Sequence, residues 1–390
     1  MKKTILIAKL KSFLILIVIA LALTFTSCPE DDNNGGNGTG GGGGGGGGNN
    51  WKWTAVSNST FGYGDINGIA YGNNRWVAVG PNGRMAYSED NGITWTAVAN
   101  IWQYIYSGDQ LTVYINAIAY GIANGESVGR FVAVGSGGKM AYSDNGSSWK
   151  AVSNSTFPAT YTSIGTTTAY LISAIACGIA DGESVGRFVA VGNGGKMAYS
   201  DDGVTWTAVS NSTIWQYGTY SDGSPRISDI YGITYGNNRF VAVGYSGKMA
   251  YSSDGVTWTA VSDSTFGAYG ISAITYGNNR FIAVGGQGKM AYSDDNGETW
   301  TAVSNSTFGT SGIGAIAYGN NRFVAVGGGG KMAYSDDNGV TWTAVSNSTI
   351  WQNGTYSDGS QRYSYIEAIA YGNNRFVAVG DNGKMAYADW

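Results

Sequence analysis

Histidine is absent from this chain of 390 residues, and proline and cysteine are scarce, with four and two residues. Histidine is the side chain that proteins use most often as a general base and a metal ligand near neutral pH. Its absence excludes catalysis by Ser/His/Asp and Cys/His arrangements. We also expect neither a metal ion nor any other cofactor.

Charge is scarce as well, because only 12% of the residues are charged, and 22 Lys and Arg against 26 Asp and Glu give a net charge of −4. A chain without a basic excess is not expected to bind nucleic acid. Glycine and aromatic residues are abundant instead, with 63 Gly, 27 Tyr and 13 Trp. This composition is typical of many short strands joined by tight turns, and it predicts an all-β protein.

The N-terminus has the pattern of a secretory signal peptide over residues 1–27. Several lysines precede an uncharged apolar run at 13–25, and two small residues lead to Cys28. This arrangement resembles the lipobox of bacterial lipoproteins, which implies that Cys28 is lipid-modified and becomes the mature N-terminus. An uncleaved membrane anchor is the alternative.

Residues 28–50 combine this cysteine with a tether that reads PEDDNNGGNGTGGGGGGGGGNN. Such a sequence cannot form a core, and as a flexible chain it has a reach of about 25 Å. Its acidic residues 30–32 resemble surface-export signals of some bacterial lipoproteins. We therefore expect a location at the outer membrane or the cell surface rather than the inner membrane, with membrane contact through the lipid only.

One sequence unit occurs seven times between residues 51 and 390, and its clearest copy spans 312–345. Every methionine except Met1 lies in a K/R-M-A-Y segment: Met85, Met140, Met197, Met249, Met290, Met332 and Met385. The shortest units are 41 to 42 residues long. This length suits four short strands and their turns, as in the blades of a propeller.

Each unit contains four strand-like runs, IGAIAYG, RFVAVG, KMAYS and TWTAV, separated by short Gly and Asn turns. Such turns favour antiparallel hairpins, and the alternation of apolar and small or polar residues argues against helices. We number these strands one to four and name each connection by the strands that it joins. The repeat predicts a seven-bladed β-propeller of four-stranded antiparallel blades over residues 51–390.

The two ends of the repeat region complement each other. The segment 51–56 is a fourth strand without a third, and 384–390 is a third strand without a fourth. Pairing them closes the ring and removes exposed sheet edges, so we expect the N-terminal strand to complete blade seven of a monomer. After processing Cys177 is the remaining thiol, and it replaces a repeated Tyr, which indicates a buried position.

The 3–4 turns read SEDNGITW, SDDNGETW and SDDNGVTW at 88–95, 293–300 and 335–342. They resemble the Asp-box, or BNR, repeat of sialidases, sortilin-type receptors and photosystem assembly propellers. The resemblance implies a structural motif, in which the Asp bonds turn amides and the Trp packs between blades. Calcium binding by these turns is the alternative.

Residues repeated in every blade are best explained by the needs of the blade, so function is sought where the blades differ. Two repeated sets of cations are therefore interpreted as solvated edges rather than an anion site. They are Arg75, Arg130, Arg187, Arg239, Arg280, Arg322 and Arg375, and Arg84, Lys139, Lys196, Lys248, Lys289, Lys331 and Lys384.

The 4–1 connections differ most, and they are long at 99–114, 157–171, 214–228 and 350–364. Three of them contain I-W-Q, and two continue as YGTYSDGSPR and NGTYSDGSQR. Exposed aromatic rings beside polar groups suit a sugar or a peptide. The candidate ligand site is Trp102, Trp215, Trp351, Gln216, Gln352, Tyr220, Tyr356, Arg226 and Arg362. The alternative is that each Trp covers its blade. On the opposite face, Glu126 and Glu183 are interpreted as solvated loop residues.

We expect a membrane-anchored, non-catalytic propeller that binds a protein or a glycan through the face of the 4–1 connections. An enzyme is the alternative, either sialidase-like or another glycan hydrolase or lyase. A sialidase needs an arginine triad, but only Arg226 and Arg362 lie outside the repeated sets. Other glycan-degrading chemistry would use carboxylates among Asp109, Asp222, Asp229, Asp358 and Glu367. A periplasmic assembly factor is the third possibility.

Overall fold

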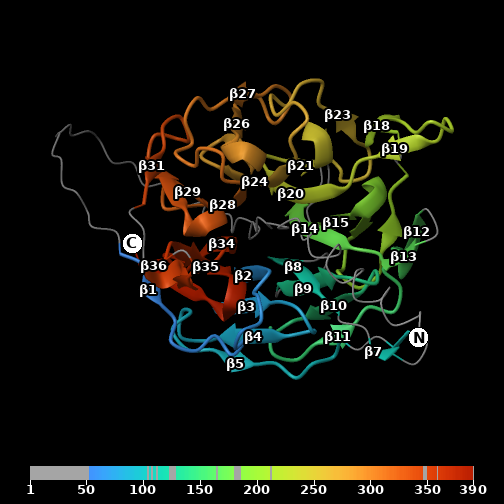
Figure 1. Ribbon diagram of the computed structural model, residues 1–390. Helices are drawn as coiled ribbons and strands as arrows, with labels where there is room; N and C mark the ends of the chain where they lie inside the picture. The colour runs from blue at the N-terminus through green and yellow to red at the C-terminus, as the bar shows by residue number, and fades with distance from the viewer. Residues whose placement is uncertain are drawn as a thin grey trace, which may run out of the picture.

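The computed structural model describes residues 52–102, 105–106, 109–110, 113–122, 129–163, 166–179, 186–210, 213–345, 349–357 and 359–389. These residues form seven four-stranded antiparallel sheets arranged as a ring (Figure 1). The seven-bladed β-propeller predicted from the repeat is confirmed.

The first strands are innermost, and each contacts the first strands of the neighbouring blades. They are β2 (Gly68–Gly72), β8 (Ile115–Gly121), β14 (Ile172–Ile179), β20 (Ile230–Gly236), β24 (Ile271–Gly277), β28 (Ile313–Gly319) and β34 (Ile366–Gly372). The second strands are β3 (Arg75–Val79), β9 (Arg130–Gly135), β15 (Gly186–Gly192), β21 (Arg239–Gly244), β25 (Arg280–Gly285), β29 (Arg322–Gly327) and β35 (Arg375–Gly380).

The two outer strands of each blade are shorter. The third strands are β4 (Met85–Ser88), β10 (Met140–Ser143), β16 (Met197–Ser200), β22 (Met249–Ser252), β26 (Met290–Ser293), β30 (Met332–Ser335) and β36 (Met385–Asp389). The fourth strands are β5 (Thr96–Ala97), β11 (Lys150–Ala151), β17 (Thr207–Ala208), β23 (Thr259–Ala260), β27 (Thr301–Ala302), β31 (Thr343–Ala344) and, for blade seven, β1 (Thr54–Ala55).

Strand β1 closes the ring by pairing with β36, and Thr54 lies opposite Tyr387 and Ala55 opposite Ala386. The predicted closure by the N-terminal strand is therefore confirmed. It completes the four-stranded sheet of blade seven. The outer edge of β36 is thereby paired, which removes a surface that could otherwise template aggregation.

The blades pack through a repeated contact between a glycine and a tyrosine. A glycine at or next to the end of each first strand lies against a side chain of the next blade, which is a tyrosine in six of the seven contacts, and a Cβ on Gly319 would lie 2.0 Å from Cγ of Tyr371. Only glycine allows this approach. In blade three Cys177 replaces the tyrosine, lies against Gly121 and is fully buried, as predicted.

The two faces of the ring differ in their connections. The 1–2 and 3–4 turns lie on one face, and the 2–3 turns and 4–1 connections lie on the other, which we call the loop face. Most 2–3 turns are short 3₁₀ helices: η1 (Asn193–Gly195), η2 (Tyr245–Gly247), η3 (Gly286–Gly288), η4 (Gly328–Gly330) and η6 (Asp381–Gly383). None of the helical segments in the described residues is long and apolar enough to cross a membrane.

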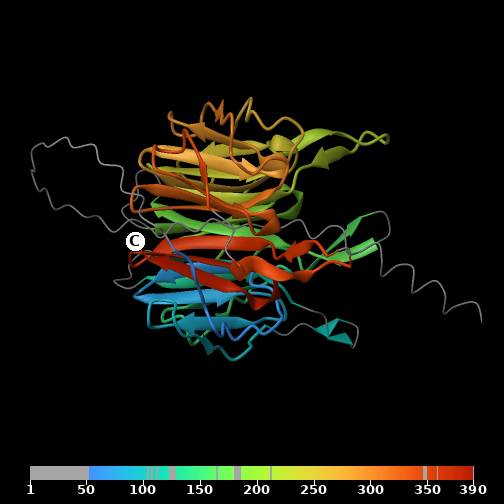
Figure 2. The ribbon, with the colours of Figure 1, turned by 60° about the vertical axis from the view of Figure 1, so that its left-hand side comes forward.

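The four long 4–1 connections each form a β-hairpin on the loop face. The strand pairs are β6 (Ile105–Tyr106) with β7 (Asp109–Gln110), β12 (Thr160–Ser163) with β13 (Thr166–Ala169), β18 (Gln216–Thr219) with β19 (Pro225–Ile227), and β32 (Gln352–Thr355) with β33 (Gln361–Tyr363). The short helix η5 (Thr349–Trp351) precedes the last pair. Figure 2 shows the hairpins projecting from one side of the ring.

Candidate binding face

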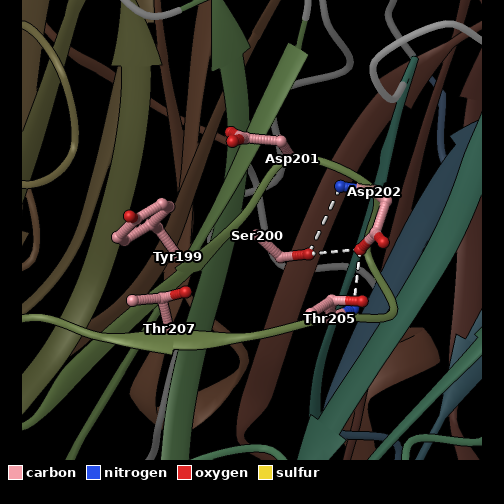
Figure 3. Close-up of a pocket in the computed structure, with 6 residues that line it drawn as sticks. All are labelled: Tyr199, Ser200, Asp201, Asp202, Thr205 and Thr207. Carbon is pink, nitrogen blue, oxygen red and sulfur yellow. Dashed lines mark hydrogen bonds between the residues drawn. The ribbon is translucent and has the colours of Figure 1, made fainter.

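Most 3–4 turns are held by an aspartate of their own, as Figure 3 shows for blade three, and blade two has Asn145 in this position. Oδ1 of Asp202 accepts hydrogen bonds from the amides of Val204 and Thr205 at 2.7 and 2.6 Å and from Oγ of Ser200 at 2.9 Å. Partial burial opposes ionisation, but these donors outweigh it and hold the pKa of Asp202 below its usual value. Asp202 also lines an open groove of about 460 Å³ beside this turn, but its carboxylate is already hydrogen-bonded within the turn.

The seven arginines that open the second strands are bound within the ring. Nε of Arg280 lies 2.6 Å from Oδ1 of Asp294, and its guanidinium carbon lies 4.0 Å from the ring centre of Tyr292. Nη1 also donates to the carbonyl of Asn338 in the next blade at 2.7 Å. Each of the seven has such an ion pair, and their side chains are 8 to 20% exposed. The interpretation of this set as a solvated edge is wrong, because the guanidinium groups are largely buried and paired with carboxylates. Bonds such as that of Arg280 to Asn338 join neighbouring blades.

Several cations of the second set hold the 4–1 connections in place. Nζ of Lys331 donates to the carbonyl of Phe308 at 2.8 Å, and Nη1 of Arg84 donates to that of Phe61 at 2.7 Å. Lys384 donates to the carbonyls of Ile350 and Gln352 at 2.7 and 2.5 Å, and burial lowers its pKa. The prediction of a solvated edge is wrong for these members as well, because their ammonium and guanidinium groups bind loop carbonyls.

The three candidate tryptophans are buried, which corrects the expectation that they are exposed. Trp102, Trp215 and Trp351 are 4%, 0% and 0% exposed. Each belongs to a set of seven aromatic residues, one in every 4–1 connection: Phe61, Trp102, Phe157, Trp215, Phe266, Phe308 and Trp351, all of them buried. The Cβ atoms of the three tryptophans pack on glycines of the 2–3 turns, for example that of Trp215 against Gly195.

The alternative that each tryptophan covers its blade agrees with this burial. The sequence contained the evidence, because S-N-S-T-F in some units becomes S-N-S-T-I-W in others. An apolar side chain on a loop gains free energy when a site in the adjacent blade can remove it from water. The tryptophans fill such sites and do not face solvent as ligand contacts.

The other candidate residues lie in the hairpins. Tyr220 and Tyr356 are 47% and 55% exposed, and Arg226 and Arg362 are exposed beside them. The two glutamines, Gln216 and Gln352, are half-buried. Gln103, Glu126, Glu183 and Cys28 lie outside the described residues.

Exposed tyrosines gather on the loop face. Among the described residues, the exposed tyrosines are Tyr63, Tyr114, Tyr217, Tyr220, Tyr245, Tyr269 and Tyr356. All seven lie in 4–1 connections or 2–3 turns. On the opposite face the exposed large apolar residues are aliphatic, for example Ile93 and Val340. Tyrosine combines a large flat surface with a hydroxyl group, which makes it common at binding surfaces.

Seven residues lie where the first strands begin on the loop face, a region that we call the mouth, and sequence reasoning had singled out only Glu367 among them. Each follows an isoleucine at the start of its first strand or, in blade one, just before it, and they are Asn67, Asn116, Ser173, Tyr231, Ser272, Gly314 and Glu367. In six blades the strand register is irregular here, which redirects the side chain. Asn67 and Asn116 each donate to the first strand of the next blade at 2.9 Å. The sequence signal is a position that varies within an otherwise repeated strand.

Three carboxylates meet at this mouth where blade seven adjoins blade one. Burial, and then the neighbouring carboxyl of Asp381, raise the pKa of Glu367 well above its usual value, and the two side chains share a hydrogen bond. Burial also raises the pKa of Asp381, although Oδ2 accepts a bond from the amide of Tyr365 at 2.8 Å. Oδ1 of Asp65 accepts from the amide of Asn382 at 3.0 Å. Glu367 and Asp381 can therefore share one proton.

The three described carboxylates among those considered for catalysis, Asp222, Asp229 and Glu367, are not brought together. Asp229 lies at the mouth in blade four, where burial raises its pKa and Oδ1 accepts a bond from the amide of Gly194 at 2.7 Å. Asp222 binds Ser224 at the tip of its hairpin, and Glu367 lies three blades from Asp229. Asp358 and the side chain of Asp109 are outside the described residues.

Comparisons with known proteins agree on the architecture. The chain is similar to the structure titled "YCF48 bound to D1 peptide", with 18% identity, a TM-score of 0.58, and coverage of 88% of this chain and 96% of the other. YCF48 from Cyanidioschyzon merolae gives 18% identity, a TM-score of 0.57 and coverage of 86% and 98%. Raptor from Chaetomium thermophilum gives 11% identity, a TM-score of 0.53 and coverage of 87% and 30%. At these identities the likeness shows the fold alone.

No curated protein matches the sequence. A family model, the DUF6242 beta propeller domain, matches residues 204–389, which run from the 3–4 turn of blade three to the third strand of blade seven. The chain is thus a seven-bladed β-propeller whose C-terminal blades match the DUF6242 beta propeller domain and whose fold resembles that of the YCF48 propellers.

Proposed function

We propose that this chain is a non-catalytic binding propeller that recognises a protein or a glycan through its loop face. The observation that carries the proposal is the gathering of the exposed tyrosines on that face. The hairpins that differ between blades project from the same face, while the repeated cations and the 3–4 turns are used in internal bonds. A YCF48 propeller has been solved with a D1 peptide bound, which supports a protein partner.

The proposal includes an anchor and a location. Cys28 carries the lipid, the Gly-rich segment is a tether, and the ring is held as a monomer at the outer membrane or the cell surface. The 3–4 turns are proposed to be Asp-box repeats with a structural role. An assembly factor in the periplasm would use the same loop face for its protein partner.

A glycan-degrading enzyme is the second candidate, and the hydrogen-bonded carboxyl pair of Glu367 and Asp381 on the loop face favours it. A protonated carboxyl beside an ionised one can act as an acid and base pair. Release of reducing ends from glycans by the wild type, lost in Glu367→Gln, would support this candidate over the binding protein.

The binding function is tested with residues 51–390, which contain every described strand and the closure of the ring. A pull-down from cell extract and a glycan array identify the ligand. We expect Tyr220→Ser with Tyr356→Ser to weaken its capture at least about tenfold. Ile93→Ser with Val340→Ser is the matched control, because these residues are similarly exposed on the opposite face. Capture lost only in the control pair would contradict the proposal.

A further inference from the structure

Two hairpins on the loop face are built in the same way. They lie in the connections that enter blades four and seven, three blades apart in the ring. At each tip a tyrosine amide donates to a serine carbonyl at 2.8 Å, from Tyr220 to Ser224 and from Tyr356 to Ser360. Because the sequences TYSDGSPR and TYSDGSQR are nearly the same, both tips present the same groups in the same order.

Each tip places an arginine on the ring of its tyrosine. The guanidinium carbon of Arg226 lies 4.9 Å from the ring centre of Tyr220, and that of Arg362 lies 6.0 Å from the ring centre of Tyr356. Among the described residues, which leave out Asp358, neither guanidinium has a carboxylate within 4.0 Å. The seven arginines of the second strands, in contrast, all have one. The exposed positive charge of the described loop face therefore includes two matched guanidinium groups.

A guanidinium held on an aromatic ring has its planar donors directed outward, which suits a carboxylate. The exposed tyrosine beside it offers a surface on which a sugar ring can stack. Two tips that present the same groups match a ligand that repeats one anionic group along its length. A repeated carboxylate on a sugar is found in polyuronates, the acidic polysaccharides.

We propose that the two hairpin tips are equivalent subsites for the carboxylates of an acidic polysaccharide, which spans the loop face from blade four to blade seven. The inference rests on the proposed binding function and names its ligand class. Each subsite consists of one tyrosine and one arginine, Tyr220 with Arg226 and Tyr356 with Arg362. A long chain occupies both subsites, so its affinity exceeds that for a short fragment.

The test is calorimetric titration of the full chain in detergent micelles with trigalacturonate and with polygalacturonate. We expect two trigalacturonate sites per chain in the wild type, one in Arg226→Gln or Arg362→Gln, and none in the double variant. Polygalacturonate should bind each single variant at least about tenfold more weakly than the wild type, because one of two linked contacts is lost. Lys150→Gln on the outer strand β11 makes the same change in charge and should leave both titrations unchanged.

Thermal melting of each variant tests whether the ring is folded. Arg226→Lys retains the positive charge without the planar donors, so we expect this variant to bind more weakly than the wild type. Absence of polygalacturonate binding by the wild type, or binding that survives the double variant, would overturn the inference. If the chain still captures a protein that the double Tyr220→Ser, Tyr356→Ser variant loses, the ligand class is wrong and the binding function stands. Capture that depends on Ile93 and Val340 instead contradicts both.

Discussion

Arg239 forms an ion pair with Glu298 across the boundary between blades four and five, with 2.8 Å between Nη1 and Oε1. The other six arginines at this position pair with a carboxylate fourteen residues later in their own blade. In blade four that position is Ser253. Glu298 lies in the 3–4 turn of the next blade and supplies the missing carboxylate, so the ring of ion pairs is complete.

We expect Glu298→Gln to lower the free energy of unfolding by about 0.2 to 1 kcal/mol, the usual range for an exposed ion pair. Adding Ser253→Asp should restore it, because the aspartate returns to the position that it has in the other blades. Urea unfolding of the four proteins in this cycle measures the coupling. No loss in Glu298→Gln would show that the pair contributes nothing. Equal losses with and without Ser253→Asp would show that an aspartate at position 253 does not replace Glu298 as the partner of Arg239.

The buried tryptophans should act on stability and not directly on binding. Trp215→Ala and Trp351→Ala each remove a fully buried ring, and we expect a loss of about 3 to 5 kcal/mol. Trp215→Phe should cost much less, about 1 kcal/mol, since phenylalanine fills the equivalent position in four blades. Chemical unfolding compares the three variants. A stable Trp215→Ala protein that no longer binds its ligand would instead identify the tryptophan as a contact.

Glu367 should make stability depend on pH. Its pKa in the folded ring is raised above the usual 4.5 by burial and by Asp381, with Asp65 nearby. The folded state therefore holds the proton more tightly than the unfolded chain. This contribution to stability is full below pH 4.5 and is lost as the pH rises through the folded pKa.

We expect the melting temperature of Glu367→Gln to be close to that of the wild type below pH 4.5 and higher than that of the wild type at neutral pH. Asp263→Asn is the control, because other units have asparagine at this exposed turn position, and its melting curve should follow that of the wild type at each pH. If the melting temperature of Glu367→Gln also equals that of the wild type at every pH, the protonation of Glu367 has no effect on the stability of the ring.

The anchor depends on a single side chain. Since Cys28 is the proposed site of the lipid, Cys28→Ala should release the ring from membranes or block its processing. Fractionation of cells and labelling with a fatty-acid analogue follow both effects, and Cys177→Ala is the control at a buried thiol. A variant at Cys28 that keeps its label and its membrane fraction would contradict the anchor.

The repeat made most of the fold predictable. Seven copies of one pattern gave the blades, and the unmatched strands at 51–56 and 384–390 gave the closure. The burial of Cys177 also followed, because it replaces a tyrosine that the repeat places in the core. These features depend on local patterns that recur, and each copy supports the others.

The candidate site was harder to predict from the same sequence. The tryptophans were interpreted by residue type rather than by their alignment with Phe61 and Phe266, so their burial was missed. Glu367 was noticed only as one carboxylate among several, because its partner Asp381 lies in a turn that a linear reading does not bring near it. Their closeness follows from the pairing of β34 with β35, which only the folded blade provides.

The most direct test of the account is photo-crosslinking in cells. A photoreactive phenylalanine analogue is placed at Tyr220 or Tyr356 on the loop face, and at Ile93 or Val340 on the opposite face. These four side chains have similar exposure, between 46% and 55%, so access to the reagent does not bias the comparison. We predict adducts from Tyr220 and Tyr356 and none from the other two. Adducts formed only from Ile93 and Val340 would contradict recognition through the loop face.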